Sequence, residues 1–233
     1  MDIEIWSDIA CPWCYIGKRR FEKGLAGFAH ADEVSVTYRS YQLDPSLPKH
    51  DPRSEREYLI AAKGMAGGQV DQMLDYVSEQ AAGEGLTYDW DALVVANSFD
   101  AHRALQYAKT HGLIAELKEA LLAAHFEQGR NIGDVDTLIE LGVGVGLDED
   151  ELRNVLTSAA YTDEVNDDIA EARSLGVTGV PFYVINRTHG ISGAQPAHMF
   201  TQALETIWEQ THPQLITIAG ADEADACGPE GCD

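Results

Sequence analysis

Basic residues are scarce in this chain of 233 residues. It has 16 lysines and arginines against 39 aspartates and glutamates, which gives a formal net charge of −23. A protein this acidic repels the phosphates of nucleic acids and the headgroups of anionic lipids. We therefore expect neither a nucleic acid nor a membrane as a partner, and we attribute the charge to solubility rather than to steering of a basic substrate.

Long apolar runs are also missing. No stretch approaches the ~20 apolar residues that span a bilayer. The first residues lack the basic segment, apolar stretch and cleavage site of a secretory signal. On these grounds we expect a cytoplasmic protein. With 45% hydrophobic residues, the chain can build one large domain, or a domain with an insertion.

Motifs for metals and phosphates are absent as well. The eight histidines show no metal-ligand spacing and form no H-E-x-x-H, so we expect no metal. Glycine recurs at alternate positions from Gly142 to Gly146, but no strand signal precedes it and no lysine follows. This stretch therefore predicts a turn between helices rather than a phosphate-binding loop.

Cysteine is rare, but its placement is informative. The four cysteines form two tight pairs at opposite ends of the chain, which is poor placement for structural disulfides across a core. In the cytoplasm, where thiols are mostly kept reduced, such pairs suggest redox or metal chemistry. The first pair, Cys11 and Cys14, follows a short apolar run. After it, Ile16, Phe21 and Leu25 recur at helical spacing.

The first pair is thus placed where a strand passes into a helix. Pro12 would occupy the first helical turn, where its missing N–H costs nothing. Unpaired N–H groups and the helix dipole stabilise an anion at that position. Thiols in C-x-x-C motifs can have a pKa as low as about 3.5–7, against about 8.5 for free cysteine. We therefore predict Cys11 as the nucleophile and Cys14, one turn further in, as the resolving thiol. A metal knuckle and chance spacing remain alternatives.

The residues around the pair resemble a known family. Ser7-Asp8 precedes C-P-W-C, and Tyr15-Ile16-Gly17 follows it. Further along come Gly179-Val180-Pro181-Phe182-Tyr183-Val184-Ile185 and Ser192-Gly193-Ala194-Gln195. Together they resemble the cytosolic, FrnE-type branch of the DsbA-like thioredoxin-fold oxidoreductases, over nearly the whole chain. The related 2-hydroxychromene-2-carboxylate isomerases and kappa-class glutathione transferases usually carry a serine or a lone thiol at this site, so two cysteines favour disulfide chemistry.

The expected fold class is α/β: a thioredoxin-like fold with a central mixed sheet, interrupted by an all-helical insertion. Residues 34–41 alternate as a strand does, and three prolines within 44–52 mark a boundary. From 54 to 173 we expect about six helices, separated at turns such as Gly67-Gly68. One helix is expected to begin at Asp89-Trp90-Asp91 and a shorter one at Asp134-Val135-Asp136.

The thioredoxin-like unit is expected to resume after the insertion. We predict a strand over 182–185, a turn over 186–190, a strand over 191–193 and a helix over 196–209. The chain then divides into a first half of the unit (1–53), a helical insertion (54–174), a second half (175–213) and a flexible acidic tail (214–233).

Several residues are candidates for substrate binding. Pro181 opens a strand directly after Gly-Val, which predicts a cis bond between Val180 and Pro181. The resemblance implies that these two residues form a wall that docks an extended substrate. Beside the thiols, we assign Pro12 and Trp13 to substrate binding. Trp13 could instead pack over the start of the helix.

Two further candidates lie in the helical insertion. The stretch Asn97-Ser98-Phe99-Asp100-Ala101-His102-Arg103 resembles the segment that faces the reactive site in the family. Asn97 could bind peptide-like groups of a substrate, and His102 could assist proton transfer because its usual pKa is near neutrality. A packing or surface role for His102 is the alternative.

The second cysteine pair ends the tail. Cys227 and Cys232 are separated by glycine, proline and glutamate residues and can close a small ring. A flexible tether would give the pair a high effective concentration at the active site. We predict an auxiliary redox pair that exchanges electrons with Cys11 and Cys14. A zinc site of four thiolates is the rival.

These observations predict a thiol-disulfide oxidoreductase that acts on protein or small-molecule disulfides. We expect no tightly bound cofactor, and a low-molecular-weight thiol or another reductant as co-substrate. A thiol-dependent isomerase or transferase for a small aromatic or polyketide-like molecule is one alternative, and a redox-sensing or chaperone-like binding module is another. Monomer and homodimer are both compatible with the sequence.

Overall fold

The computed structural model describes residues 1–213, 227–228 and 231–232. A mixed sheet of four strands has the order β2-β1-β3-β4. The strands are β1 (Asp2–Ser7), β2 (Ser35–Ser40), β3 (Phe182–Ile185) and β4 (His189–Ser192). β1 pairs in parallel with β2 and antiparallel with β3, which pairs antiparallel with β4. The expected central mixed sheet is confirmed.

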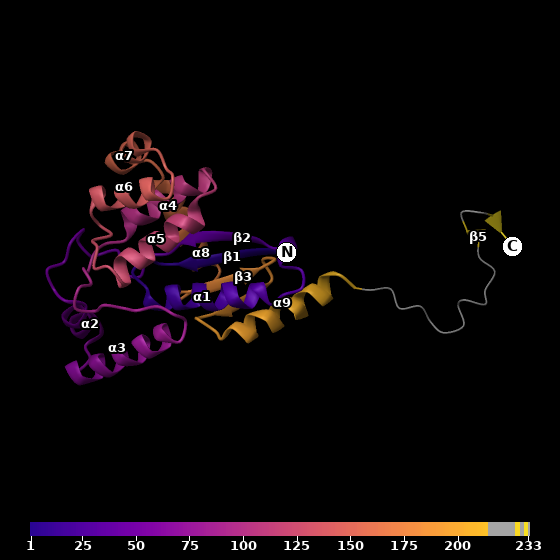
Figure 1. Ribbon diagram of the computed structural model, residues 1–233, viewed down its shortest axis with the longest axis horizontal. Coiled ribbons are helices and arrows are strands. Elements are labelled where there is room, and N and C mark those ends of the chain that lie inside the picture. Colours follow the sequence, from indigo (N-terminus) through magenta and orange to yellow (C-terminus); the bar gives the residue numbers. More distant parts are fainter. Residues whose placement is uncertain (214–226, 229–230, 233) are drawn as a thin grey trace.

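One face of the sheet is covered by α1 (Pro12–Ala26) and α9 (Ala197–Thr211), which lie side by side (Figure 1). Their apolar faces bury the odd-numbered side chains of β1, because successive strand residues point to opposite faces. Ile3 and Ile5 pack there with Phe21 and Phe200. Gly24 lets the helices approach closely, since a Cβ at this position would lie 2.6 Å from the Ala197 carbonyl oxygen.

The opposite face is covered by α8 (Thr162–Ser174). Trp6 packs there with Ala172, and its Nε1–H donates to the carbonyl oxygen of Asp168 at 2.9 Å. The Asp168 carboxylate accepts from the Ser40 amide at 2.8 Å and from Arg39 at 2.9 Å. The boundaries drawn from the sequence place α8 in the insertion, but its contacts make it the second helical layer of the sheet.

Residues 54–174 form seven helices, one more than expected. Besides α8, they are α2 (Glu55–Lys63), α3 (Gly67–Ala82), α4 (Phe99–Thr110), α5 (Ile114–Phe126), α6 (Val135–Gly144) and α7 (Glu149–Thr157). In Figure 1, α4 to α7 gather above the sheet, and α2 and α3 lie below it. The largest core joins the start of α1 to α5, where Tyr15 and Ile16 share a cluster with Leu117 and Leu121.

Side-chain caps explain where several helices begin. Ser54 and Glu57 form a reciprocal capping box at the start of α2. Asp134 accepts from the Thr137 amide, which confirms the helix start expected there. Asp148 caps α7 through the Glu151 amide in the same way.

The prediction that a helix begins at Asp89 is wrong. Residues 91–98 form no helix, and α4 begins only at Phe99. The backbone of this segment is bonded to other parts of the chain: Asp51 donates to the Val95 carbonyl, and the Asn97 amide donates to the Pro48 carbonyl. These tertiary hydrogen bonds replace the local ones that a helix would make.

Two glycine-rich turns are shifted from their expected places. Gly67 begins α3, and Gly64, with φ of +64°, ends α2 instead. Gly142 to Gly144 belong to α6, so the turn begins at Val145 and uses Gly146, with φ of +103°. Glycine adopts this left-handed conformation without steric cost.

The acidic tail expected over 214–233 lies outside the described residues, apart from two short strands. β5 (Cys227–Gly228) pairs antiparallel with β6 (Gly231–Cys232), and Cys227 is opposite Cys232. Among the helices that the structure describes, none combines the length and apolar composition needed to cross a bilayer.

Candidate active site

Cys11 lies where β1 passes into α1. It is the N-cap residue of the helix, with φ of −102° and ψ of 112°, and Pro12 follows in the first turn. The Cys14 amide donates to the Cys11 carbonyl at 3.0 Å, which brings the second cysteine onto the same turn. Both thiols are buried, with 4% of Cys11 and 2% of Cys14 exposed. The expected strand-to-helix placement is confirmed.

Val180 and Pro181 face the first thiol. Their peptide bond is cis, as predicted, and the Cys11 thiol donates to the Val180 carbonyl oxygen at 3.5 Å. Gly17 allows this approach, because a Cβ there would lie 2.8 Å from both Pro181 Cγ and the Tyr183 hydroxyl. The segments 11–17 and 180–183 thus contact each other, although Cys11 and Val180 are 169 residues apart in the sequence.

Gly17→Ala is expected to destabilise the protein by about 1–3 kcal/mol, since the added methyl group overpacks this contact. Chemical denaturation measures the loss. Gly68→Ala in α3 is the matched control, because no atom lies within 4 Å of its Cβ position. Equal stabilities of the two variants would contradict the assigned contact.

Cys14 is held in its thiol form. Burial, a hydrogen bond with Cys11 and the charge of Cys11 raise the pKa of Cys14 well above its usual value. The ammonium of Lys118 on α5 acts in the opposite sense. Lys118 is itself buried, 1% exposed, and burial lowers its pKa to about 8. Lys118 is therefore placed to support ionisation of Cys14 when the thiol is needed.

Asp8 links the reactive turn to the helical region. Its carboxylate accepts from the Leu43 amide at 2.7 Å, from the Ala10 amide at 3.2 Å and from His102 Nε2 at 3.2 Å. Burial opposes ionisation of Asp8, but the His102 and Leu43 hydrogen bonds hold its pKa below the usual value. His102 is 1% exposed and lies behind Asp8, outside the pocket described below. A role of His102 in proton transfer, acting through Asp8, stays a prediction.

Asn97 is not brought to the thiols. Its Nδ2 donates to the Leu47 carbonyl at 2.7 Å, and its Oδ1 accepts from Gln42 at 2.8 Å and from the Phe99 amide at 2.9 Å. The side chain thus joins the 42–47 loop to the start of α4. These hydrogen bonds give Asn97 a structural role, and its expected role in substrate binding stays a prediction.

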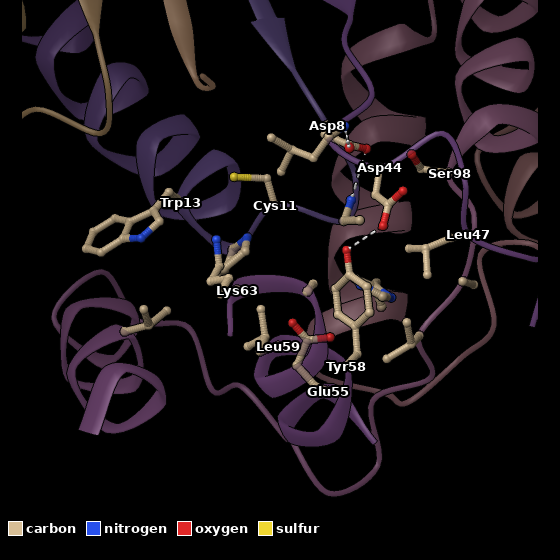
Figure 2. A pocket seen from close by; sticks show the side chains of 18 of the residues that line it. Asp8, Cys11, Trp13, Asp44, Leu47, Glu55, Tyr58, Leu59, Lys63 and Ser98 are labelled. Carbon is tan, nitrogen blue, oxygen red and sulfur yellow. Dashed lines mark hydrogen bonds between the residues drawn. The ribbon is translucent and has the colours of Figure 1, made fainter. Parts of the chain in front are cut away.

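A pocket of about 400 Å³ opens beside Cys11, between the reactive turn and the helices α2 and α3 (Figure 2). Most of its wall is apolar, and α2 contributes one face of a helix at positions 55, 58, 59, 62 and 63. In Figure 2, Lys63 is the labelled α2 side chain on the Cys11 side, and Glu55 lies beside Tyr58. Burial raises the pKa of Glu55 to about 7.

Pro12, Trp13 and Val180 all line this pocket, and their assignment to substrate binding stays a prediction. Trp13 is half-buried and packs against Tyr76 of α3 with 6.0 Å between ring centroids. The Pro12 carbonyl accepts from the Tyr88 hydroxyl at 2.8 Å. Trp13 thus packs against α3 and also forms part of the pocket wall.

Sequence reasoning missed Lys118 and His125. Both lie on the apolar stripe of α5, at the spacing of Ile114, Leu121 and Leu122. A lysine on such a stripe could have indicated a functional residue, because lysine is almost never fully buried unless it is paired. His125 lines the pocket, and burial lowers its pKa to about 4, so it is neutral at pH 7.

In the described ranges, no group of three or more His, Cys, Asp or Glu residues could hold a metal.

Comparisons with known proteins identify the family of this chain. A family model described as the DSBA-like thioredoxin domain matches residues 2–205. A probable DsbA oxidoreductase from Streptomyces coelicolor is 47% identical, with a TM-score of 0.87 over 100% of this chain and 98% of that chain. YwbO of Bacillus subtilis (strain 168) is 27% identical over 213 residues, which are 87% of this chain and 94% of that protein.

A more distant structure has the same fold. The cytosolic disulfide reductase DsbM from Pseudomonas aeruginosa is 20% identical, with a TM-score of 0.62 over 90% of this chain and 100% of that chain. The family match spans β1, both cysteines of the first pair, Pro181 and most of α9. With a C-x-x-C pair at the start of α1 and a cis-proline facing it, the chain belongs to the DsbA-like thioredoxin domain family.

Proposed function

We propose that the protein is a thiol-disulfide oxidoreductase that uses Cys11 and Cys14. The observation that carries the proposal is the buried dithiol at the start of α1, with Cys11 bonded to the Val180 carbonyl next to Pro181. A helix N-terminus stabilises a thiolate, which is the species that attacks a disulfide. The family match supports this activity at the level of the reaction type.

The two cysteines have different roles in the proposed reaction. The Cys11 thiolate attacks one sulfur of the substrate disulfide and releases the other as a thiolate, which leaves a mixed disulfide on Cys11. Cys14 loses its proton with the help of Lys118 and attacks Cys11. This step forms the Cys11–Cys14 disulfide and releases the second substrate thiol. The substrate gains two electrons, and the protein loses them.

We further propose a low-molecular-weight thiol as the co-substrate that resets the pair, and a cytoplasmic location. Support comes from the small number of cysteines and from the fold-level similarity to a cytosolic reductase that also has a structure with GSH. Such a thiol would act in exchange with the Cys11–Cys14 disulfide and would need no dedicated cofactor site.

A glutathione redox titration of the intact protein tests the proposal. The peptide that contains Cys11 and Cys14 should pass reversibly between dithiol and disulfide, as measured by alkylation and mass spectrometry. A midpoint near about −120 to −180 mV would indicate an oxidase or isomerase, and one near about −270 mV a reductase. Failure of the two cysteines to form a disulfide at any potential would overturn the proposed function.

We also propose Cys227 and Cys232 as an auxiliary redox pair. Opposed residues of an antiparallel pair have Cα atoms about 4.5–5.5 Å apart, within the range that a disulfide spans. The side chains themselves lie outside the described residues. Replacing both cysteines with serine is expected to remove a second two-electron transition from the titration and to slow turnover. Unchanged turnover would contradict the role.

A further inference from the structure

The residues that line the pocket beside Cys11, called the pocket wall below, limit which disulfides can reach the Cys11 sulfur. Five side chains of α2, at positions 55, 58, 59, 62 and 63, and three of α3, at 73, 74 and 77, line the pocket. Their spacings place them on one face of each helix. Because only 4% of Cys11 is exposed, a disulfide must enter this pocket to reach its sulfur.

The wall is fixed at several points. On α2, the Tyr58 hydroxyl donates to Asp44 at 2.9 Å. On α3, Tyr76 packs against Trp13, and Arg20 of α1 donates to Gln80 at 2.8 Å. Arg20 also binds Glu84 just beyond the end of α3. These contacts tie both helices to the segments around the thiol, so the pocket is largely preformed.

The space inside suits a small molecule. A volume of about 400 Å³ is within the range of pockets that enclose small ligands. The wall is mainly apolar, with Leu47, Leu59, Leu74, Val77 and Val95 among its residues. In a folded protein, each sulfur of a disulfide is joined through Cβ to a backbone that continues in two directions, so such a disulfide is much bulkier near its sulfurs than a small molecule.

Building on the proposed function, we infer that the protein acts on small-molecule disulfides that carry an apolar portion, in preference to disulfides of folded proteins. The apolar portion lies against α2 and α3 while one sulfur contacts Cys11. Cys11 forms a mixed disulfide with half of the molecule and releases the other half as a thiol. Attack by Cys14 then releases the second thiol and leaves the Cys11–Cys14 disulfide, so electrons and protons balance.

Single-turnover oxidation of the reduced full chain tests this inference. The probes are bis(2-hydroxyethyl) disulfide, diphenyl disulfide bearing a solubilising group on each ring, and insulin as the folded protein. Acid quenching, alkylation and mass analysis of the Cys11–Cys14 peptide give the second-order rate constants. We expect the aromatic disulfide to react at least 100-fold faster than insulin after correction for the reaction of each probe with a free model thiol.

Two alanines of α2 provide matched variants. Ala62 lines the pocket and Ala61 does not, and both are exposed. Ala62→Phe should fill the pocket and slow the reaction with the aromatic disulfide about tenfold, whereas Ala61→Phe should change it less than twofold. Thermal unfolding shows whether both variants fold, and alkylation by iodoacetamide reports the intrinsic reactivity of Cys11. A smaller filling residue, as in Ala62→Leu, replaces Phe if that variant does not fold.

The outcomes separate the inference from the proposed function. Equal corrected rates for insulin and the small disulfides, or equal effects of the two phenylalanine variants, would overturn the inference and leave the oxidoreductase function intact. Oxidation of the Cys11–Cys14 pair by none of the three probes would overturn both. The inference is supported if the wild type prefers the aromatic disulfide, Ala62→Phe loses this preference, and Ala61→Phe retains it.

Discussion

Cys11→Ser is expected to reduce disulfide exchange to the rate measured without protein. A serine hydroxyl does not ionise at neutral pH and cannot form a mixed disulfide, so no step of the proposed reaction can start. The fold should remain intact, because serine is among the preferred N-cap residues and Cys11 has that position in α1. We therefore expect the melting temperature of this variant to equal or exceed that of the wild type.

Cys14→Ser is the control that separates the two thiols. Without an added thiol, Cys11 can still attack in this variant, so one substrate thiol should be released per protein, against two for the wild type. Continued full turnover of the variant with no mixed disulfide on Cys11 would contradict disulfide chemistry. That result would favour instead the isomerase or transferase considered from the sequence, which needs no resolving thiol.

Lys118→Met is expected to slow resolution of the mixed disulfide on the order of tenfold at pH 7, because it removes a buried positive charge that lowers the pKa of Cys14. Without this charge the pKa of Cys14 rises further, and less thiolate forms. Raising the pH should restore much of the lost rate. Rapid-quench measurement of the mixed disulfide and its decay gives the rate. An unchanged rate and pH profile would contradict the assigned role.

The same substitution should stabilise the fold. The pKa of Lys118 is about 8 in the folded protein, against a usual value of 10.5, so burial of its charge costs about 3 kcal/mol below pH 8. Between pH 8 and 10.5 the unfolded state binds the additional proton, and wild-type stability therefore rises with pH relative to Lys118→Met. Denaturation at pH 7 and pH 10 should show a gain for the variant that shrinks at the higher pH.

Local sequence signals were sufficient to predict the features that depend on residues close together in the sequence. The C-x-x-C pair at the start of a helix and the proline that opens β3 each follow from the residues beside them, and both were found as expected. The helix start at Asp134 belongs to the same class, since a side chain and an amide three residues away define its cap.

Features that depend on contacts between distant segments could not be derived in this way. The segment after Asp89 is not helical because Asp51 and Pro48 take its backbone hydrogen bonds. Asn97 has the chemistry of a ligand-binding residue, but the 42–47 loop uses its groups. The pocket beside Cys11 likewise depends on where α2 and α3 pack, which the spacing of their apolar residues does not specify.

The measurement that tests the central claim most directly is the intact mass of Cys14→Ser after brief exposure to bis(2-hydroxyethyl) disulfide, followed by peptide mapping. We predict one added 2-mercaptoethanol unit on Cys11, released by dithiothreitol, and no such adduct on Cys14 in the Cys11→Ser protein under the same conditions. An adduct on Cys14 with none on Cys11, or no adduct on either residue, would contradict the assignment of Cys11 as the attacking thiol.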